Sequence, residues 1–368
     1  MKKVALVTIL DNTNYGTYLQ ALATGLSVRK LGCDITIIRY IRKVTTPRFQ
    51  LSEIKAQSVL RYLYHKFFRM PQKERLKKKD VEFVRQFIDV TPDYYSIDDI
   101  KKKLPVYDIY MTGSDQVWNS IYNRGIDRCM FLDFAPKEKK RVAYAASIGM
   151  DAIPESEKTE TVNLLNQYSK ITVREQQAVD LLSKHGIDAD VVLDPTLLLN
   201  RNEWLEIAKR NNMDFKEPYM LVYSVEGKKE SELIEKYATT IAKSRGLKIY
   251  EITYNHSMKS MKFADKHFCL ATPEVFLNLM EKASFVVVSS FHGTAFAINL
   301  NKQFLTISPG RFNSRVENIL NITGLQSRLV KDDNYDISLM DEIFYLPVNE
   351  KLETERHKSI SALKNLLQ

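Results

Sequence analysis

The sequence predicts an α/β protein made of two consecutive doubly wound units with a ligand-binding cleft between them. First, short apolar runs bounded by turn residues alternate with segments of helical period. Second, 368 residues exceed one ordinary small domain, so about two domains are expected. Third, a polar stretch at 201–217 separates two sets of elements, as an inter-domain connection would.

The chain opens with the pattern strand, loop, helix, strand. The apolar run Val4–Leu10 is typical of a strand buried on both faces of a parallel sheet. Apolar residues at helical spacing predict a helix over Thr17–Leu31, which Gly32 ends. The second strand is expected at Asp34–Tyr40. This β-α-β order indicates a doubly wound sheet.

Residues 41–104 break the alternation with a basic, mainly helical pattern, in which eight cations and one carboxylate fall between 61 and 79. The first unit then continues with strands at 106–112, 141–146, 170–173 and 190–193, and helices at 155–168 and 175–184. The second unit has strands at 219–225, 247–253, 283–290 and 304–307, and helices at 229–244, 274–282 and 295–300.

Composition narrows the functional classes. The chain is 44% hydrophobic and 27% charged, which excludes a disordered or collagen-like protein. Its charge, 54 − 45 = +9, favours phosphate-bearing substrates, a membrane surface or nucleic acid. Three widely spaced cysteines argue against a disulfide framework and fit a reducing cytosol. No apolar stretch approaches the roughly 20 residues that span a bilayer, so we expect a cytoplasmic protein that touches membrane only peripherally.

The strongest local motif is Ser289–Ala295, where an apolar strand runs into a helix. A helix N-terminus with Ser290, Gly293 and Thr294 predicts an anion site. His292 is the candidate to bind that anion or to move a proton. The alternative is that Ser290 only caps the helix and His292 is structural.

Two further motifs follow first-unit strands. Arg174, at a predicted helix start, suits a carboxylate, and Glu175 beside it is also explained by the helix dipole. A surface salt bridge is the alternative for this pair. In the motif 113–119, Asp115 is a candidate general base and Trp118 a candidate platform for a sugar ring, or else a cap and a core tryptophan.

Weaker candidates complete the set. The loop with Asn14 and Tyr15 lacks the glycines of a dinucleotide fingerprint, so it is either a substrate loop or a plain turn. Arg311 and Arg315 suit an anion or are solvated. The histidines show no metal-ligand spacing, so no metal is expected. The basic stretch 61–79 is either a solvated face or, with its interleaved aromatics, a membrane-surface element; no nucleic-acid-binding module accompanies it.

Together the motifs resemble the polysaccharide pyruvyl transferase family. The resemblance rests on four passages in order: Asn14-Tyr15-Gly16 with the Leu19-Gln20-Ala21 that follows; GSDQVW at 113–118 with YAASIG at 144–149; VREQQA at 173–178 with VVLDPTLLL at 191–199; and SSFHGTAFA at 289–297. It implies a glycosyltransferase-B-like fold of two Rossmann-like lobes with the active-site cleft between them. The boundaries would be 1–205, 206–345 and a C-terminal helix at 346–368, with the basic insertion at about 45–104.

The resemblance also implies transfer of the enolpyruvyl unit of phosphoenolpyruvate to a sugar, commonly as a cyclic ketal, with no cofactor. His292 and Arg174 would hold phosphoenolpyruvate, and Asp115 or Glu175 would accept a hydroxyl proton. The basic aromatic insertion favours a lipid-linked acceptor at the inner face of the membrane. Two alternatives stay open: a nucleotide-sugar glycosyltransferase of the same fold, and a non-catalytic module that docks a polysaccharide assembly complex on membrane.

Overall fold

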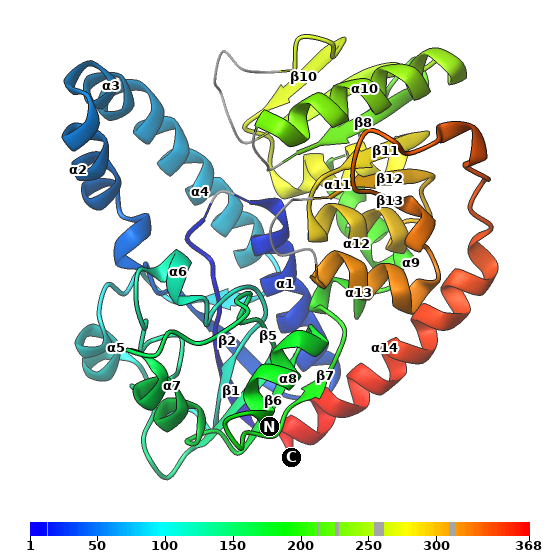
Figure 1. The fold of residues 1–368 in the computed structure, drawn as a ribbon. Coiled ribbons are helices and arrows are strands. Elements are labelled where there is room, and N and C mark those ends of the chain that lie inside the picture. Colours follow the sequence, from blue (N-terminus) through cyan, green and yellow to red (C-terminus); the bar gives the residue numbers. More distant parts are fainter. Residues whose placement is uncertain (13, 212, 225–227, 254–260, 309–313) are drawn as a thin grey trace. The chain divides into compact units, whose positions relative to one another are not determined.

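The computed structural model describes residues 1–12, 14–211, 213–224, 228–253, 261–308 and 314–368. The chain forms two compact units (Figure 1). Unit 1 consists of Met1–Leu198 and His357–Gln368, and unit 2 of Leu199–Arg356. Each unit is a parallel sheet with helices, so the α/β class and the two Rossmann-like lobes predicted from the sequence are confirmed.

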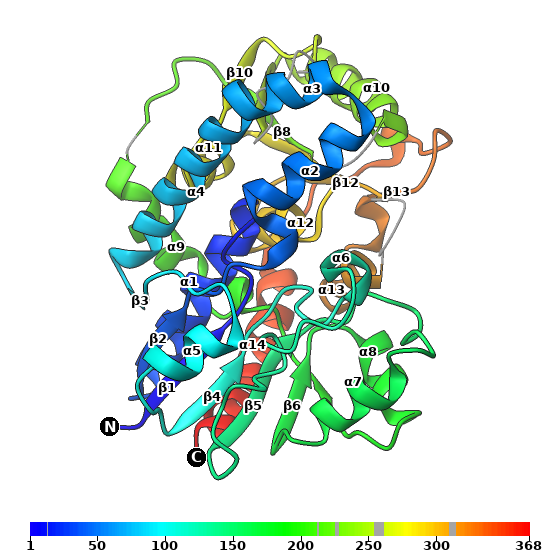
Figure 2. The same ribbon diagram turned by 90° about the vertical axis from the view of Figure 1, so that its left-hand side faces the viewer.

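The sheet of unit 1 has the strand order β3-β2-β1-β4-β5-β6-β7, with parallel neighbours (Figure 2). This is the Rossmann order with one strand added at an edge. The strands are β1 Lys3–Val7, β2 Asp34–Ile38, β3 Asp89–Val90, β4 Ile109–Thr112, β5 Lys140–Ala146, β6 Lys170–Val173 and β7 Asp190–Val191. Because the central strands are covered on both faces, every residue of β4 is buried.

The helices of unit 1 follow the expected pattern. They include α1 Tyr15–Lys30, α5 Ile97–Lys103, α6 Ser120–Asn123, α7 Lys158–Leu165 and α8 Gln176–Ser183. Helix α1 begins after Asn14, whose Oδ1 accepts the N–H of Gly16 at 2.9 Å. It ends with Arg29 and Lys30, whose charges complement the helix dipole.

The basic segment 41–104 contains the crossover from β2 to β3. It holds α2 Pro47–Gln57, α3 Val59–Tyr64, the π-helical turn η2 His65–Arg69 and α4 Met70–Arg85. The sequence showed a break in the α/β alternation here, whereas the structure places β3 within the segment, paired with β2. With only Asp89 and Val90 and no longer apolar run beside them, β3 gives little pattern to recognise in the sequence.

Unit 2 repeats the same strand order, as β10-β9-β8-β11-β12-β13. Its strands are β8 Tyr219–Tyr223, β9 Lys248–Thr253, β10 Lys266–Cys269, β11 Phe285–Val288, β12 Phe304–Ile307 and β13 Leu329–Val330. Its helices include α9 Arg201–Ala208, α10 Lys228–Arg245, α11 Pro273–Lys282, α12 Phe291–Asn299 and α13 Ser314–Thr323, and α14 Tyr345–Leu367 ends the chain.

The predicted connection at 201–217 begins with a helix instead. Asn200 and Glu203 form a capping box that starts α9. Trp204 is fully buried in unit 2, with its ring centroid 5.0 Å from that of Phe296. The division therefore falls at Leu198, seven residues before the expected 205, because α9 packs on α11 and α12 of unit 2. The last residues of α14 belong to unit 1.

Among the residues that the structure describes, no helix is long and apolar enough to cross a membrane.

Candidate functional site

The strand order places the candidate site in each unit. It reverses between β1 and β4 in unit 1, and between β8 and β11 in unit 2. Open α/β sheets bind ligands outside the carboxyl ends of the strands at such a switch point. Loops that carry the predicted motifs follow β4 and β11 at these points, and the Arg174 motif follows β6 at the same edge of the first sheet.

Four charged side chains meet at the carboxyl ends of β4, β6 and β7. We call Asp115, Arg174, Glu175 and Asp194 the arginine cluster. The guanidinium of Arg174 is at its centre, with 0% of the side chain exposed. Its Nη1 lies 2.8 Å from Asp194 Oδ2, its Nη2 3.5 Å from Asp115 Oδ1, and its Nε 3.8 Å from Glu175 Oε2.

The carboxylates of the cluster keep Arg174 charged. Burial lowers the pKa of Arg174, but the charges of Asp194, Asp115 and Glu175 outweigh burial and raise this pKa above its ordinary value. All three nitrogens of the guanidinium face carboxylates of the cluster, and no part of the Arg174 side chain is exposed. This arrangement favours a positioning role for Arg174 over the predicted grip on an anionic substrate.

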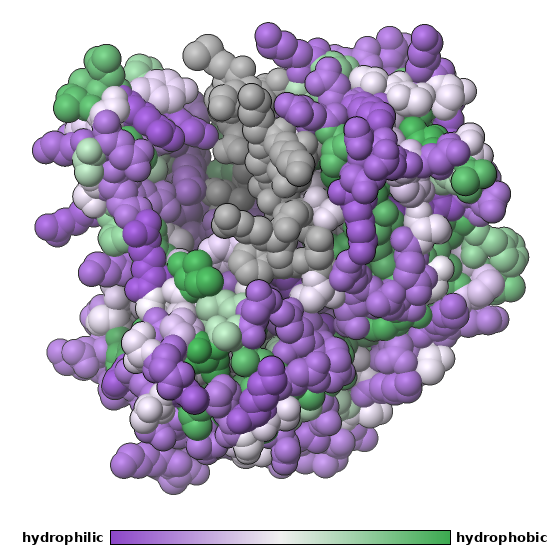
Figure 3. Space-filling model, viewed as in Figure 1, coloured by the Kyte–Doolittle hydropathy of each residue, from purple (hydrophilic) through white to green (hydrophobic). Residues whose placement is uncertain are grey.

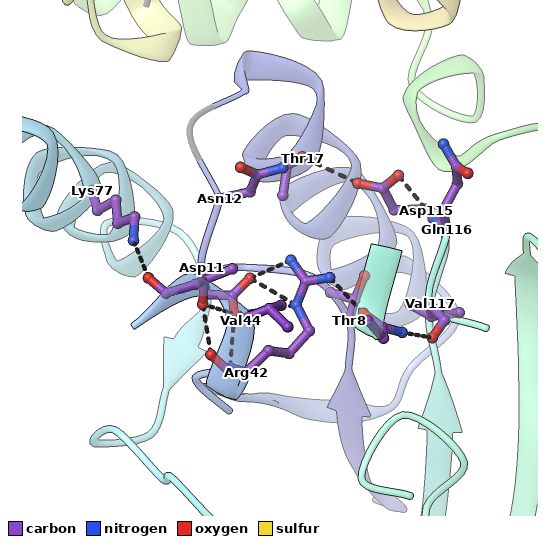
Figure 4. Close-up of polar contacts among 12 residues, drawn as sticks. Thr8, Asp11, Asn12, Thr17, Arg42, Val44, Lys77, Asp115, Gln116 and Val117 are labelled. Carbon is purple, nitrogen blue, oxygen red and sulfur yellow. Dashed lines mark hydrogen bonds and ion pairs between the residues drawn. The ribbon is translucent and has the colours of Figure 1, made fainter. Parts of the chain in front are cut away.

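Asp115 is the most exposed carboxylate of the cluster, with 14% of its side chain accessible, against 3% for Glu175 and 0% for Asp194. Thr17 Oγ1 donates to its Oδ2 at 3.1 Å, and the N–H of Gln116 donates to its Oδ1 at 2.8 Å (Figure 4). Its φ of 77° is left-handed, a conformation that non-glycine residues adopt mainly where function or packing requires it. Its carboxylate is therefore held by neighbours and still reachable.

Glu175 is engaged by the loop after β5. Its Oε1 accepts Ser147 Oγ at 2.8 Å and the N–H of Ile148 at 3.2 Å. That loop leaves β5 after an irregularity, where the pairing with β6 shifts and Ala145 has a φ of 52°. These contacts give Glu175 a structural task, and they leave Asp115 as the better candidate for a general base.

A chain of hydrogen bonds, which the sequence analysis did not predict, supports the arginine cluster on the side of Asp194. Gln20 Nε2 donates to Thr8 Oγ1 at 2.9 Å, and Thr8 Oγ1 donates to the Ser114 carbonyl at 2.7 Å. Ser114 Oγ then donates to Asp194 Oδ2 at 2.8 Å. All four side chains are buried, so this chain ties α1 and the exits of β1 and β4 to the cluster.

A second buried ion pair joins the exits of β1 and β2. Arg42 Nη2 lies 2.8 Å from Asp11 Oδ1, and Thr45 Oγ1 donates to Asp11 Oδ2 at 2.6 Å (Figure 4). Arg42 Nη1 also donates to Asn123 Oδ1 at 2.9 Å, at the end of α6. Asp11 directly follows the first apolar run, and this position is the only feature of the sequence that could have indicated it.

Three residues of unit 1 that were predicted to bind substrate cap a helix or pack in the core. Asn14 caps α1, and Tyr15 is fully buried in its first turn. Trp118 is buried, with its ring stacked on Phe131 at 5.6 Å and its Nε1 donating to Met130 O at 3.2 Å. The cavity beside Trp118 measures about 10 Å³, room for about one water molecule, so the structure favours a core tryptophan over a sugar platform.

In unit 2 the motif at 289–295 forms the junction of β11 and α12. Ser290 caps the helix, because its Oγ accepts the N–H of Gly293 at 3.1 Å. Ser289 Oγ donates to Ser224 Oγ at 3.0 Å and so joins the ends of β11 and β8. Thr294 Oγ1 donates to the Ser290 carbonyl at 2.9 Å and lies 2.9 Å from Thr306 Oγ1.

These contacts give Ser290, Gly293 and Thr294 structural tasks at the start of α12. Thr294 is fully buried, and its hydroxyl is used within the fold. A Cβ at Gly293 would lie 2.9 Å from Val288 Cβ and Cγ1, so glycine is needed here for the packing of α12 on β11. The cap and the glycine set the angle at which the helix begins.

His292 remains the candidate for chemistry in unit 2. It lies in the first turn of α12 with 6% of its surface exposed, and its ring is edge-on to Phe291 at 5.2 Å. Arg315 lies in the first turn of α13, half-buried, and Arg311 falls outside the described residues. A histidine at a helix N-terminus can bind an anion and transfer a proton.

The structure thus joins two motifs that are far apart in sequence, those of Asp115 and of Arg174 with Glu175, and adds Asp194 to them. Within the part of the chain that the structure describes, no group of three His, Cys, Asp or Glu side chains is arranged to hold a metal ion.

Comparison with protein families decides the identity. The sequence model of the family described as polysaccharide pyruvyl transferase matches residues 14–311, which is most of the chain. This chain belongs to the polysaccharide pyruvyl transferase family. The resemblance drawn from the four motifs is confirmed, and the protein is a transferase. Comparison with curated proteins gives no match.

Solved structures similar to this pyruvyl transferase share its fold. A UDP-GlcNAc 2-epimerase from Methanocaldococcus jannaschii is 13% identical with a TM-score of 0.53, covering 99% of this chain and 100% of the other. A putative UDP-N-acetylglucosamine 2-epimerase from Listeria monocytogenes is 11% identical with a TM-score of 0.53, covering 98% and 90%. At these identities the likeness shows the fold alone, which is glycosyltransferase-B-like with two Rossmann-like lobes.

Proposed function

We propose that this transferase moves the enolpyruvyl unit of phosphoenolpyruvate onto a saccharide, closes a ketal across two hydroxyls and releases phosphate. We further propose that the acceptor is a lipid-linked polysaccharide repeat unit. The donor proposal rests on the position of His292 in the first turn of α12, beside the switch point of the second sheet.

The site for phosphoenolpyruvate needs hydrogen-bond donors and cations, because this small molecule carries a carboxylate and a phosphate. The dipole of α12 favours negative charge at its N-terminus, where His292 lies. His292 can donate a hydrogen bond to an oxyanion there. Arg315, also in unit 2, supplies a cation that stays protonated at every working pH.

The reaction makes two C–O bonds and breaks one. A proton is added to the vinyl carbon of phosphoenolpyruvate, and one sugar hydroxyl attacks the central carbon. The second hydroxyl then displaces phosphate from that carbon. Of the two hydroxyl protons, one replaces the proton given to the vinyl carbon and the other leaves with phosphate. His292 is the proposed proton donor, since imidazole exchanges protons near neutral pH.

Asp115 is the proposed base for the attacking hydroxyl. It is more exposed than Glu175 and is oriented by Thr17 and Gln116. Arg174 and Asp194 hold it in place and do not touch substrate in this proposal. The basic aromatic segment between α2 and α4 supports a lipid-linked acceptor, because such an acceptor would be presented at a membrane.

The test measures phosphate release from phosphoenolpyruvate with a panel of lipid-linked saccharides. Mass analysis should show an acceptor heavier by one pyruvic acid less one water. An ester or an enol ether would add the same mass, so NMR must show a quaternary carbon bonded to two sugar oxygens and no vinyl protons, as a ketal requires. We expect His292→Ala to lower the rate by a factor of about 10²–10⁴, the usual size of acid–base catalysis. His357→Ala is the matched control, since it removes an exposed histidine of α14.

Undiminished transfer by His292→Ala would refute the role of His292. Release of UDP from a UDP-sugar, with no turnover of phosphoenolpyruvate, would instead establish the nucleotide-sugar alternative.

A further inference from the structure

The helices α2, η2 and α3, with the first turns of α4, form an arm that extends from the sheet of unit 1 (Figure 1). We propose that the tip of this arm, residues 58–69, docks on the surface of an anionic lipid bilayer. Docking would give the enzyme access to a lipid-linked acceptor, and this part of the proposal rests on the proposed function. The docking itself can be measured without any catalytic turnover.

The base of the arm is anchored and its tip is not. From Leu76 onward α4 is anchored: Leu76, Val81, Phe83 and Val84 are buried, and α4 packs on α1. In contrast, all residues of α2 and α3 are exposed or half-buried. Within the tip His65 of η2 is buried, whereas most of the arm's buried residues lie at the α4 end.

The exposed residues of the tip are large and apolar. Leu60 is 82% exposed, and Phe67 and Phe68 are each 62% exposed. Figure 3 shows hydrophobic side chains at the end of the arm beside hydrophilic ones. Such residues are normally turned toward a core, and an exposed group of them indicates an interaction surface.

Their spacing is that of an amphipathic helix. Residues 60, 63 and 64 lie on one face of α3, and Phe67 and Phe68 follow in the π-helical turn η2. In an amphipathic helix of a globular protein such residues would cover the core, whereas here each of the five is among the exposed large hydrophobic residues. Tyr64 and Phe68 stack, with ring centroids 5.9 Å apart. The apolar face is formed but has nothing of unit 1 to cover.

The charge around this face favours an anionic surface. The sequence from 54 to 73 contains no Asp or Glu and carries five cations: Lys55, Arg61, Lys66, Arg69 and Lys73. Lys66 Nζ lies 5.7 Å from the centroid of the Tyr62 ring and 5.5 Å from that of Phe67. Cations beside aromatic and aliphatic side chains are typical of helices that lie in the interface of a bilayer.

Two other occupants fit less well. A second copy would bring the three cations of one tip, Arg61, Lys66 and Arg69, against the same three of the other, which is repulsive. A nucleic acid would satisfy the cations but would leave the aliphatic Leu60 and Leu63 against phosphate and sugar. A bilayer with anionic headgroups satisfies both halves of the surface.

The experiment sediments the full-length protein with vesicles of phosphatidylcholine, with or without phosphatidylglycerol. We expect strong binding only with phosphatidylglycerol, and weaker binding at high salt. Removing three cations of the tip by Arg61→Gln, Lys66→Gln and Arg69→Gln together should weaken vesicle binding about a hundredfold, at about fivefold per cation. Replacing Leu60→Ser, Phe67→Ser and Phe68→Ser should weaken it by at least about as much.

Two matched controls separate the tip from general charge and exposure. Lys101→Gln, Lys102→Gln and Lys103→Gln in α5 remove the same charge from exposed positions. Leu339→Ser, Phe344→Ser and Leu346→Ser remove apolar side chains that are 78%, 73% and 60% exposed. Both controls should bind vesicles as the unchanged protein does.

The proposal is overturned if the unchanged protein does not sediment with anionic vesicles, or if the controls weaken binding as much as the tip variants. It is also overturned if neutral vesicles bind equally well, or if the serine variant abolishes self-association and not vesicle binding. Tip variants should keep their transfer rate with a water-soluble acceptor. If transfer fails for every protein while vesicle binding still depends on the tip, the proposed function falls and docking stands.

Discussion

Arg174 Nη1 and Asp194 Oδ2 lie 2.8 Å apart, and neither side chain is exposed to solvent. Asp194 also accepts Ser114 Oγ and, through its other oxygen, both the N–H and the hydroxyl of Thr196. One carboxylate therefore joins the exits of β4, β6 and β7, and the guanidinium it holds is oriented toward Asp115.

Replacing Asp194→Asn should lower the free energy of unfolding by about 3–5 kcal/mol, because it leaves the buried guanidinium without its nearest counter-charge. Urea unfolding measures this loss. The matched control is Asp190→Asn, which breaks an exposed pair with Lys170 at 3.2 Å and should cost less than about 1 kcal/mol. Equal losses in the two variants would contradict a central role for Asp194.

Asp115→Asn and Glu175→Gln should differ in kind. We expect Asp115→Asn to lower kcat by a factor of about 10² or more with the fold kept, because it removes the proposed base and little packing. Glu175→Gln should instead lower the unfolding midpoint more than kcat, since Glu175 holds Ser147 and Ile148. Phosphate-release rates beside circular-dichroism melting curves check both. The reverse assignment would make Glu175 the base.

Asp11 should make folding sensitive to acid. Burial raises the pKa of Asp11, but the charge of Arg42 and the hydrogen bonds of Arg42 and Thr45 bring this pKa below its ordinary value. Such a carboxylate stabilises the fold above its ordinary pKa of about 3.9, and the stabilisation is lost as the pH falls through the lower folded value.

The difference in unfolding free energy between the unchanged protein and Asp11→Asn should therefore be about 3–5 kcal/mol near neutral pH and shrink below about pH 4. Urea unfolding at a series of pH values measures it. Asp89→Asn, whose exposed carboxylate pairs with Arg29 at 3.2 Å, should show a small difference throughout. A difference for Asp11→Asn that grew on acidification would have the wrong sign.

Gly293→Ala should destabilise unit 2, although alanine ordinarily stabilises a helix by about 1 kcal/mol. The added Cβ would lie 2.9 Å from Val288 and 3.0 Å from Ser290 Oγ, so α12 would have to move off β11. We expect a loss of about 1–3 kcal/mol and a lower rate, because His292 moves with the helix. A raised melting temperature would show that the contact relaxes freely.

Much of the fold follows from sequence because apolar runs report strands that are buried on both faces. The limits of β6 and β12 were predicted to the residue. The strands β3 and β13 were missed. Strand β7 is equally short, but it was predicted because the apolar run Val191–Leu193 extends it in the sequence. Strand β10 was missed because Lys266 and His267 at the edge of the sheet are exposed. The helix α9 was taken for a connection because the sequence 201–217 is mostly polar, although Trp204 is buried and anchors the helix.

The residues of the candidate site were predicted in separate motifs, not as one cluster. Asp115 and Arg174 lie in separate motifs, and their meeting depends on strand order, which local pattern does not encode. Asp194 stood within a quoted motif without a role, because nothing local shows that it faces a guanidinium. Arg42 was hidden among the other cations of its segment, and only its pairing with Asp11 distinguishes it.

The complete burial of α12 restricts protein engineering of this enzyme. Every residue from Phe291 to Asn299 is covered, so a mutational library along this helix would mostly yield unfolded chains. Variation aimed at other donors is better placed beside the helix, at Ser224, where the chain leaves β8 with part of its surface open.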